Sequence, residues 1–226
     1  IYVSSDPEVV RVDDTGHVTG LKKGTATVTA YELVGGRKFQ ADPVTFTVTD
    51  QSSGTVTAVK VLAKDLTVKN PSDGGYSVSG DSVTIKAMGQ GLWATQTANN
   101  VIVSGENVNR GDGPFTAIVK MSGKTVNNWD EAGLFIYKDD DNYVAVERKH
   151  GTNSPKVHVV TEANGSANED QNTENPNAEA IWLKLEKSGN TFTGYCSVDK
   201  ENWTKVGNSI TNDKIGNSFG VALVAG

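Results

Sequence analysis

Apolar and polar residues alternate along much of this chain with the two-residue period of a half-buried β-strand. In the run Thr25–Ala30, alanine and valine alternate with threonine, and Val44–Thr49 repeats the pattern with valine and phenylalanine. Successive side chains of a strand point to opposite faces, so each run predicts a strand with one face in a core. Helical periodicity is not sustained anywhere in the sequence. The pattern therefore predicts an all-β protein.

The same alternation continues through the rest of the chain. It predicts strands at Ser82–Met88, Phe115–Met121, Ala132–Tyr137, Tyr143–Arg148, Lys156–Thr161, Ile181–Lys187, Thr191–Ser197 and Phe219–Val224. Many short strands joined mostly as hairpins favour a double-sheet jelly roll.

A polar, small-residue segment separates two parts of the pattern. The run Asp50–Thr55 has the composition of a flexible linker. We therefore predict a first domain at residues 1–50, a linker at 51–58 and a second domain at 59–226. Turn signals at Asp13–Gly16 and Val34–Gly36 make the first domain a small sandwich.

Composition excludes several classes of function. The net charge is −6, which gives nucleic acid no basic face to bind. No stretch of 18 apolar residues is present, so we predict no membrane insertion. The single cysteine, Cys196, shares a strand face with Phe192 and is expected to be a buried structural thiol. Because the chain opens inside what looks like a strand, we interpret it as a piece of a longer protein.

The first domain carries motifs of a known family. Ser4–Asp13, Gly16–Leu21 and Gly24–Ala30 supply a serine–aspartate–proline turn, a hairpin and a strand in one order. In that order they closely resemble the bacterial immunoglobulin-like group 2 domain. The resemblance implies a spacer or adhesion module of a secreted or cell-surface protein. The strands that the family places before the serine turn are absent, so the domain is expected to be N-terminally incomplete.

The second domain resembles another family. Asp130–Val144 and Trp182–Thr193 are similar to two hairpins of concanavalin/laminin-G-like jelly-roll modules, and Ser197–Trp203 is similar to the turn that follows them. Such modules are attached to bacterial β-xylosidases, arabinofuranosidases and other glycoside hydrolases. The resemblance implies a non-catalytic part in polysaccharide degradation, with a glycan and an adjacent catalytic domain of the same polypeptide as partners. A final strand of the family is missing here. Because both domains lack edge strands, we expect the 226 residues to be less stable alone than in the parent protein.

Glycoside hydrolysis needs two carboxylates about 5–10 Å apart across a sugar. Acidic residues of this domain supply candidates, but acidic residues are also common at the turns of an acidic protein. No nucleophile, zinc or phosphate motif accompanies them. We therefore predict that the chain has no catalytic residues of its own.

The acidic hairpin around Asp139–Asn142 allows three interpretations. It is a solvated turn whose aspartates bond their own backbone, a structural calcium site, or part of a sugar site. The candidate calcium ligands are Asp139, Asp140 and Asp141. No other cofactor is predicted.

Sugar rings stack on flat aromatic side chains while carboxylates and amides bond their hydroxyls. Trp129 and Trp93 fall in predicted loops, where an aromatic has no packing role of its own, whereas Trp182 is interpreted as core and Trp203 as covering a turn capped by Asp199. Strand alternation places Tyr143 and Glu147 on one face, where they could form a cluster with Trp129. The candidate carbohydrate-binding residues are Trp93, Trp129, Glu131, Tyr137, Asp141, Asn142, Tyr143 and Glu147.

The long polar segment Asn164–Asn177 is predicted to be a loop, either a wall of the binding site or a mobile excursion. The leading hypothesis is a spacer followed by a carbohydrate-binding module. The alternatives are a sandwich that only supports a neighbouring glycosidase domain, and a surface adhesin. The sequence names neither the glycan, the attached enzyme, the oligomeric state nor a bound metal.

Overall fold

The structure of the protein is a computed structural model that describes residues 1–16, 18–48, 66–94, 96–151, 154–170, 174, 176 and 178–226. Every helix or strand in these ranges is a β-strand, as the alternation predicts. The chain divides into two compact units, Ile1–Val59 and Lys60–Gly226. The predicted linker, residues 51–58, lies outside the described residues.

The first unit is built around one long strand. Its elements are β1 (Tyr2–Ser4), β2 (Val10–Val12), β3 (Val18–Gly20), β4 (Gly24–Val34), β5 (Arg37–Gln40) and β6 (Val44–Val48). Strand β4 pairs with β1, β5 and β6, and β2 and β3 form a separate hairpin. Ala26 and Val28 of β4 are buried with Val9 and Val10, and Phe46 packs against them. The inward face predicted for β4 and β6 is confirmed.

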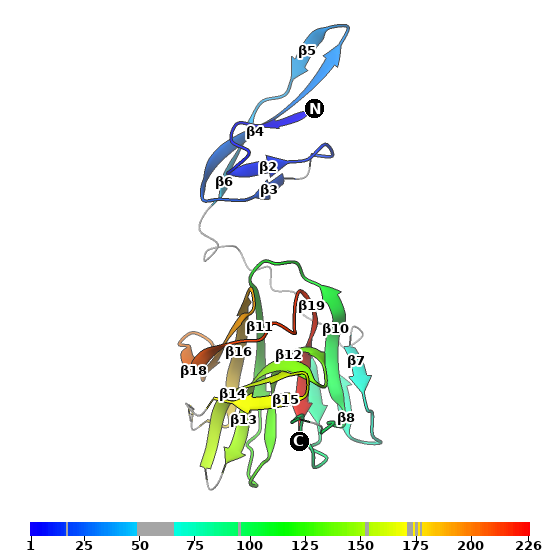
Figure 1. Ribbon diagram of the computed structural model, residues 1–226, viewed down its shortest axis with the longest axis vertical. Helices are drawn as coiled ribbons and strands as arrows, with labels where there is room; N and C mark the ends of the chain where they lie inside the picture. The colour runs from blue at the N-terminus through cyan, green and yellow to red at the C-terminus, as the bar shows by residue number, and fades with distance from the viewer. Residues whose placement is uncertain are drawn as a thin grey trace. The chain divides into compact units, whose positions relative to one another are not determined.

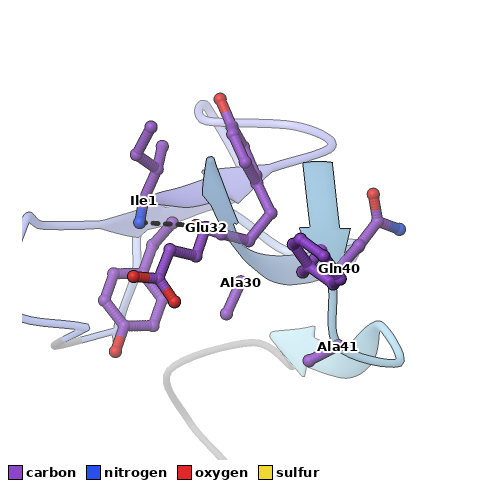
Figure 2. A pocket seen from close by; sticks show the side chains of 8 residues that line it. Ile1, Ala30, Glu32, Gln40 and Ala41 are labelled. Carbon is purple, nitrogen blue, oxygen red and sulfur yellow. Dashed lines mark hydrogen bonds between the residues drawn. The ribbon is translucent and has the colours of Figure 1, made fainter. Parts of the chain in front are cut away.

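The outer end of this unit is apolar and open. Phe39 is 59 % exposed and Ile1 is 63 % exposed, so β5 and the beginning of the chain add little to the core. Between β1, β4 and β5 lies an open depression of about 360 Å³, in which the Ile1 amino group donates a hydrogen bond to the Tyr31 carbonyl (Figure 2). The first unit therefore has a small, one-sided core.

The second unit contains two large sheets and a hairpin. Its strands are β7 (Leu66–Lys69), β8 (Tyr76–Ser79), β9 (Ser82–Ile85), β10 (Val101–Asn109), β11 (Phe115–Ser122), β12 (Glu131–Asp139), β13 (Asn142–Gly151), β14 (Ser154–Ala163), β15 (Ser166–Glu169), β16 (Ala180–Ser188), β17 (Thr191–Ser197), β18 (Thr204–Thr211) and β19 (Ser218–Ala225). One sheet has the order β15-β14-β13-β12-β19-β10-β7, and the other has the order β11-β16-β17-β18 (Figure 1). All the pairs are antiparallel, as expected for a jelly roll.

The main core lies between these two sheets. Leu134 and Val144 of the seven-stranded sheet meet Leu183 and Phe192 of the four-stranded sheet, all essentially without exposure. Cys196 is buried in the same core, so its prediction as a structural thiol is confirmed. Trp182, however, alternates with the buried residues of β16 and is only half-buried on the outer face. The prediction of Trp182 as core is therefore wrong, because strand parity assigns it to the face opposite Ile181 and Leu183.

The opposite face of the seven-stranded sheet is covered by the chain before β10. Leu92 and Ala98 pack on Phe135, Tyr143 and Val160, which form a second buried cluster. The seven-stranded sheet is thus buried on both faces over most of its area. Its end near β13–β15 carries a group of buried or half-buried polar side chains on the face that this segment covers, among them Glu147, Lys149 and His158.

The eight strands predicted for this unit are confirmed, with bounds that differ by at most three residues. Strands β7, β8, β10, β15 and β18 were not predicted. Gly105 and Asn107 interrupt β10 with positive φ angles, which breaks the alternation that would have revealed it. The segment predicted as a long loop contains β15, which pairs with β14, and Glu174, which bridges to Val157. The rest of residues 171–177, apart from Pro176, lies outside the described residues.

Candidate ligand site at the end of the seven-stranded sheet

Trp129 is held on the surface by a tightly bonded turn. The Asp130 carboxylate accepts hydrogen bonds from the backbone amides of Val126 and Asn127 and from the Asn127 side chain. The Trp129 amide donates to the His150 carbonyl at 2.8 Å. Trp129 itself has a φ of 77°, which costs a side-chain-bearing residue about 1–2 kcal/mol, and its side chain is 66 % exposed. The backbone at Trp129 is therefore strained, and the indole ring that it carries is exposed to solvent.

Trp93 approaches the same place from the segment that covers the sheet. Its neighbours are fixed: the Leu92 carbonyl accepts a hydrogen bond from the Tyr143 hydroxyl at 2.7 Å, and the Ala94 amide donates to the Glu162 carboxylate at 2.9 Å. The Trp93 side chain is half-buried. Trp93 is therefore anchored on both sides, although it belongs to a segment without regular structure.

Lys149 joins the two tryptophans. Its ammonium nitrogen lies 5.6 Å from the ring centroid of Trp93 and 5.1 Å from that of Trp129. Both distances are within the range of a cation–π interaction. The same nitrogen lies 2.8 Å from a carboxylate oxygen of Glu169 on β15, and only 6 % of Lys149 is exposed. Two predicted residues from distant parts of the sequence are thereby brought to one place.

Carboxyl groups surround this lysine on the same sheet face. Glu131 lies opposite Lys149 in the β12–β13 register, and Glu147 lies opposite His158 in the β13–β14 register. Glu147 is almost fully buried, and Glu131 is half-buried. The ring nitrogens of His158 are 3.6 Å from Glu147 and 3.2 Å from Glu169, and neither has a hydrogen-bond partner.

Close backbone packing makes room for the two glutamates. A Cβ atom at Gly133 would lie 2.6 Å from the Glu147 side chain, and one at Gly91 would lie 1.8 Å from the Glu131 carboxylate. Side chains other than hydrogen at these positions would push the carboxyl groups out of place.

Burial sets the protonation of this cluster. Loss of water raises the pKa of Glu147 to about 8. Burial, together with the nearby charge of Glu147, raises the pKa of Glu131 to about 8. Burial, reinforced by Lys149, lowers the pKa of His158 to about 4. Burial also raises the pKa of Glu169, but the hydrogen bond and charge of Lys149, together with His158 and Lys156, outweigh burial, so that the pKa of Glu169 is lowered.

At neutral pH the cluster therefore contains protonated Glu131 and Glu147, a neutral imidazole, and the Lys149–Glu169 ion pair. Protonated carboxyl groups both donate and accept hydrogen bonds. The accessible part of this arrangement combines two indole rings, the Glu131 carboxyl group and the Glu169 carboxylate. Such groups can stack on a ring and bond its hydroxyls.

The two predicted tyrosines lie elsewhere. Tyr137 and Tyr143 are fully buried, and their hydroxyls bond the Asp140 carboxylate and the Leu92 carbonyl. Tyr143 thus contributes indirectly, by anchoring the segment that carries Trp93. We leave both tyrosines out of the candidate site.

The acidic hairpin is bonded to itself. The Asp139 carboxylate accepts hydrogen bonds from the Asp141 amide at 3.1 Å and the Asn142 side chain at 2.7 Å. Asn142 also accepts one from the Asn164 amide. Among the described residues, no group of three or more histidine, cysteine or acidic side chains is arranged to hold a metal ion, and this includes Asp139, Asp140 and Asp141. The geometry is that of the solvated turn, which is the first of the three interpretations.

Sequence reasoning placed Trp93, Trp129, Glu131 and Glu147 among the candidates and missed Lys149, His158 and Glu169. Lys149 and His158 could have been found from strand parity, because they continue the face of Glu147 on β13 and on its neighbour. Glu169 carried no such signal, since β15 lies in a segment with the composition of a loop.

The comparisons with known families agree with this fold. Residues 112–222 match the family model of the beta xylosidase C-terminal concanavalin A-like domain. Residues 1–40 match the model of the bacterial Ig-like domain (group 2). Both resemblances inferred from the sequence motifs are confirmed. The concanavalin-like match includes all of the candidate site except Trp93.

Solved structures share the architecture at low sequence identity. A functionally unknown protein from Saccharomyces cerevisiae matches with a TM-score of 0.60 and 18 % identity, over 72 % of this chain and 88 % of its own. The GH43 BlXynB protein from Bacillus licheniformis matches with a TM-score of 0.61 and 16 % identity, over 96 % of this chain and 42 % of its own. Bacteroides ovatus Xyloglucan PUL GH43B matches with a TM-score of 0.55 and 14 % identity, over 91 % of this chain and 48 % of its own.

At these identities the likeness establishes the fold alone. The chain spans less than half the length of the two bacterial proteins. No curated protein matches the sequence. In the described part of the chain, no helix is long and apolar enough to cross a membrane.

Proposed function

We propose that the second unit is a carbohydrate-binding module that serves a glycoside hydrolase, and that its site consists of Trp129, Trp93, Glu131, Lys149 and Glu169. The first unit acts as a spacer, and the parent protein is secreted or held on the cell surface. The partner is a catalytic domain of the same polypeptide, which the module holds close to its polysaccharide. The match to a β-xylosidase C-terminal domain model supports this assignment.

The observation that carries the proposal is Trp129. Its turn is rigid and its backbone is strained, yet its ring is mostly exposed and makes no contribution to either core. Exposed aromatic rings on preorganised turns are typical of surfaces that recognise ligands, because binding then costs little conformational entropy. Lys149 fixes the second ring, Trp93, beside the first.

In this mechanism the C–H face of a sugar stacks on the Trp129 ring. Hydroxyl groups accept from protonated Glu131 and donate to the Glu169 carboxylate. Each hydrogen bond replaces one made to water, so the affinity for a single sugar is low. The benefit comes from tethering, because binding raises the local concentration of the attached enzyme on its polysaccharide.

Glu147 and His158 lie in the interior beside the residues of the site. Both are too buried to touch a ligand, but His158 lies next to Glu169, which is accessible. They are positioning residues, because the His158 ring lies 3.2 Å from the Glu169 carboxylate and 3.6 Å from Glu147, which packs beside it.

The test is an array of neutral plant, fungal and mucin polysaccharides probed with the full chain, followed by affinity electrophoresis on any glycan retained. Trp129→Ala should weaken retention about tenfold, which corresponds to about 1.4 kcal/mol. Tyr76→Ala is the matched control, because Tyr76 is an exposed aromatic residue on the separate β8–β9 hairpin. Its retention should be unchanged.

Two results would overturn the proposal. One is a folded chain that no glycan on the array retains. The other is a retained glycan whose binding is equally strong in the wild type and in Trp129→Ala.

A further inference from the structure

The outer face of the four-stranded sheet carries three aromatic side chains that the core does not use. Trp182 lies on β16, Tyr195 on β17, and Trp203 in the segment before β18. All three are half-buried on the face turned away from the seven-stranded sheet. The outward face of a sandwich sheet is usually polar, so several aromatics on one such face indicate an interaction surface.

Lysine side chains are interleaved with these rings. The Lys184 ammonium lies 4.1 Å from the ring centroid of Tyr195 and 4.8 Å from that of Trp203. Lys200 and Lys120 lie 4.7 Å and 5.8 Å from the ring of Trp182.

The sheet register extends this arrangement across all four strands. Lys120 on β11 is opposite Trp182, and Lys205 on β18 is opposite Tyr195. Adjacent strands are about 4.8 Å apart, so four strands span about 14 Å. That length suits a run of several sugar residues better than a single one.

The whole chain has a net charge of −6, whereas the strands of this face carry more lysines than carboxylates. Its one strand carboxylate, Glu186, is paired with Lys184 at 2.8 Å. Within the described residues, no ion pair involves Lys120, Lys200 or Lys205. In the part of the chain that the structure describes, these three ammonium groups therefore have no carboxylate within ion-pair distance, and two of them, Lys120 and Lys200, lie over the Trp182 ring.

A rigid turn positions one of these cations. The Asp199 carboxylate accepts hydrogen bonds from the amides of Glu201 and Asn202, from the Asn202 side chain and from the Ser197 hydroxyl. Lys200 is held in this turn with a φ of 68°. These hydrogen bonds lower the pKa of Asp199 and hold its carboxylate in the turn, while the Lys200 ammonium lies over the Trp182 ring.

From these observations we infer that the outer face of β11, β16, β17 and β18 is a second binding surface, for polysaccharide chains that carry carboxylate groups, such as uronic acid residues. The rings offer flat surfaces for the sugar, and Lys120, Lys200 and Lys205 offer partners for the carboxylates. This surface lies on the other sheet from Trp129 and is independent of the function proposed above.

The experiment is affinity electrophoresis of the full chain in gels with polygalacturonate, with glucuronoxylan or with a neutral xylan. The triple variant Lys120→Gln, Lys200→Gln, Lys205→Gln should lose at least tenfold in retention on the acidic polymers and be unchanged on the neutral one. Raising NaCl from 50 to 500 mM should weaken the wild type to a similar degree. Thermal melts check that the variant is folded.

Two controls distinguish this surface from the alternatives. The variant Lys22→Gln, Lys23→Gln, Lys38→Gln makes the same change of charge in the first unit and should bind acidic polymers like the wild type. Trp129→Ala should also leave acidic binding intact, so failure of one proposal is distinguishable from failure of the other.

The inference is overturned if acidic polymers do not retain the wild type, or if the triple variant is retained equally well. It is also overturned if polyglutamate binds as strongly as polygalacturonate, because the surface would then recognise charge without sugar. Loss of acidic binding in Trp129→Ala, with the triple variant unaffected, would assign these polymers to the first site instead.

Discussion

Lysines meet tryptophans at two places in the second unit, and the two places differ in burial. At the end of the seven-stranded sheet, Lys149 is 6 % exposed, is bonded to Glu169, and lies among further carboxyl groups. On the four-stranded sheet, Lys120 and Lys200 are exposed and have no ion pair among the described residues. The same pair of residue types therefore performs different tasks: a buried lysine fixes the geometry of a site, whereas an exposed lysine leaves its charge available to a ligand.

The largest expected effect comes from removing the buried charge. Lys149→Met should lower the free energy of unfolding by about 3 kcal/mol, because the Glu169 carboxylate loses its cation in a poorly hydrated place. Lys184→Met removes a lysine that is bonded to a partly exposed glutamate, and should cost less than about 1 kcal/mol. Urea denaturation of both variants measures the difference. Equal losses would show that burial does not separate the two places.

The next effect is a dependence of stability on pH. Glu131 and Glu147 have pKa values of about 8 in the fold, against 4.5 in their unperturbed state, so the folded chain holds more protons than the unfolded chain between these values. Stability therefore falls as pH rises through that range. His158, with its pKa lowered from 6.5 to about 4, acts in the opposite direction, but only below pH 6.5.

Between pH 6.5 and pH 8 His158 does not oppose the two carboxyl groups, and we expect the free energy of unfolding to fall by about 3 kcal/mol across this window. Glu147→Gln should reduce the slope, since a neutral amide does not titrate. Thermal melts at half-unit pH steps provide the measurement. A stability that rises between pH 6.5 and 8 would contradict the protonation assigned to the cluster.

A smaller effect tests the strain at Trp129. Both Trp129→Gly and Trp129→Ala remove the ring, but only glycine adopts a φ of 77° without steric cost. The glycine variant should therefore be about 1 kcal/mol more stable than the alanine variant. Chemical denaturation compares the two directly. If alanine is the more stable residue here, the turn is not strained and the argument for a ligand surface loses its first support.

The smallest expected effect concerns salt. Retention of a neutral glycan at the Trp129 site should change by less than about twofold between 50 and 500 mM NaCl, because stacking and hydrogen bonds are not screened. This contrasts with the strong salt effect expected on the four-stranded sheet. A steep salt dependence at Trp129 would remove the distinction between the two places.

The sequence alone predicted much of the fold, because alternating apolar and polar residues indicate which face of a strand is buried. In the second unit it identified β9, β11 to β14, β16, β17 and β19, and it placed Glu147 on the face of Tyr143. Where the backbone departs from regular pleating, the signal is lost, as in β10 with its bulge near Gly105. Trp182 was misassigned because a large apolar residue was taken as buried against the parity of its own strand.

The site shows a similar division. Loop position singled out Trp93 and Trp129, because tryptophan has no packing role in a segment without periodicity. Nothing local could show that Lys149 reaches both rings, since their positions depend on the segment before β10 and on the turn at Asp130. Tyr143 was a reasonable ligand candidate by its face, but the same segment covers it.

The sequence by itself determined the all-β architecture, the resemblance to two families and the faces of most strands, because these depend on periodicity and short motifs. The tertiary structure decided which polar groups are hidden and which are open to a ligand. Burial depends on neighbours far apart in the chain, such as Gly91 against Glu131 and Glu169 beside Lys149. Protonation, charge and access at both surfaces follow from that burial, and so their chemistry could be derived only from the folded protein.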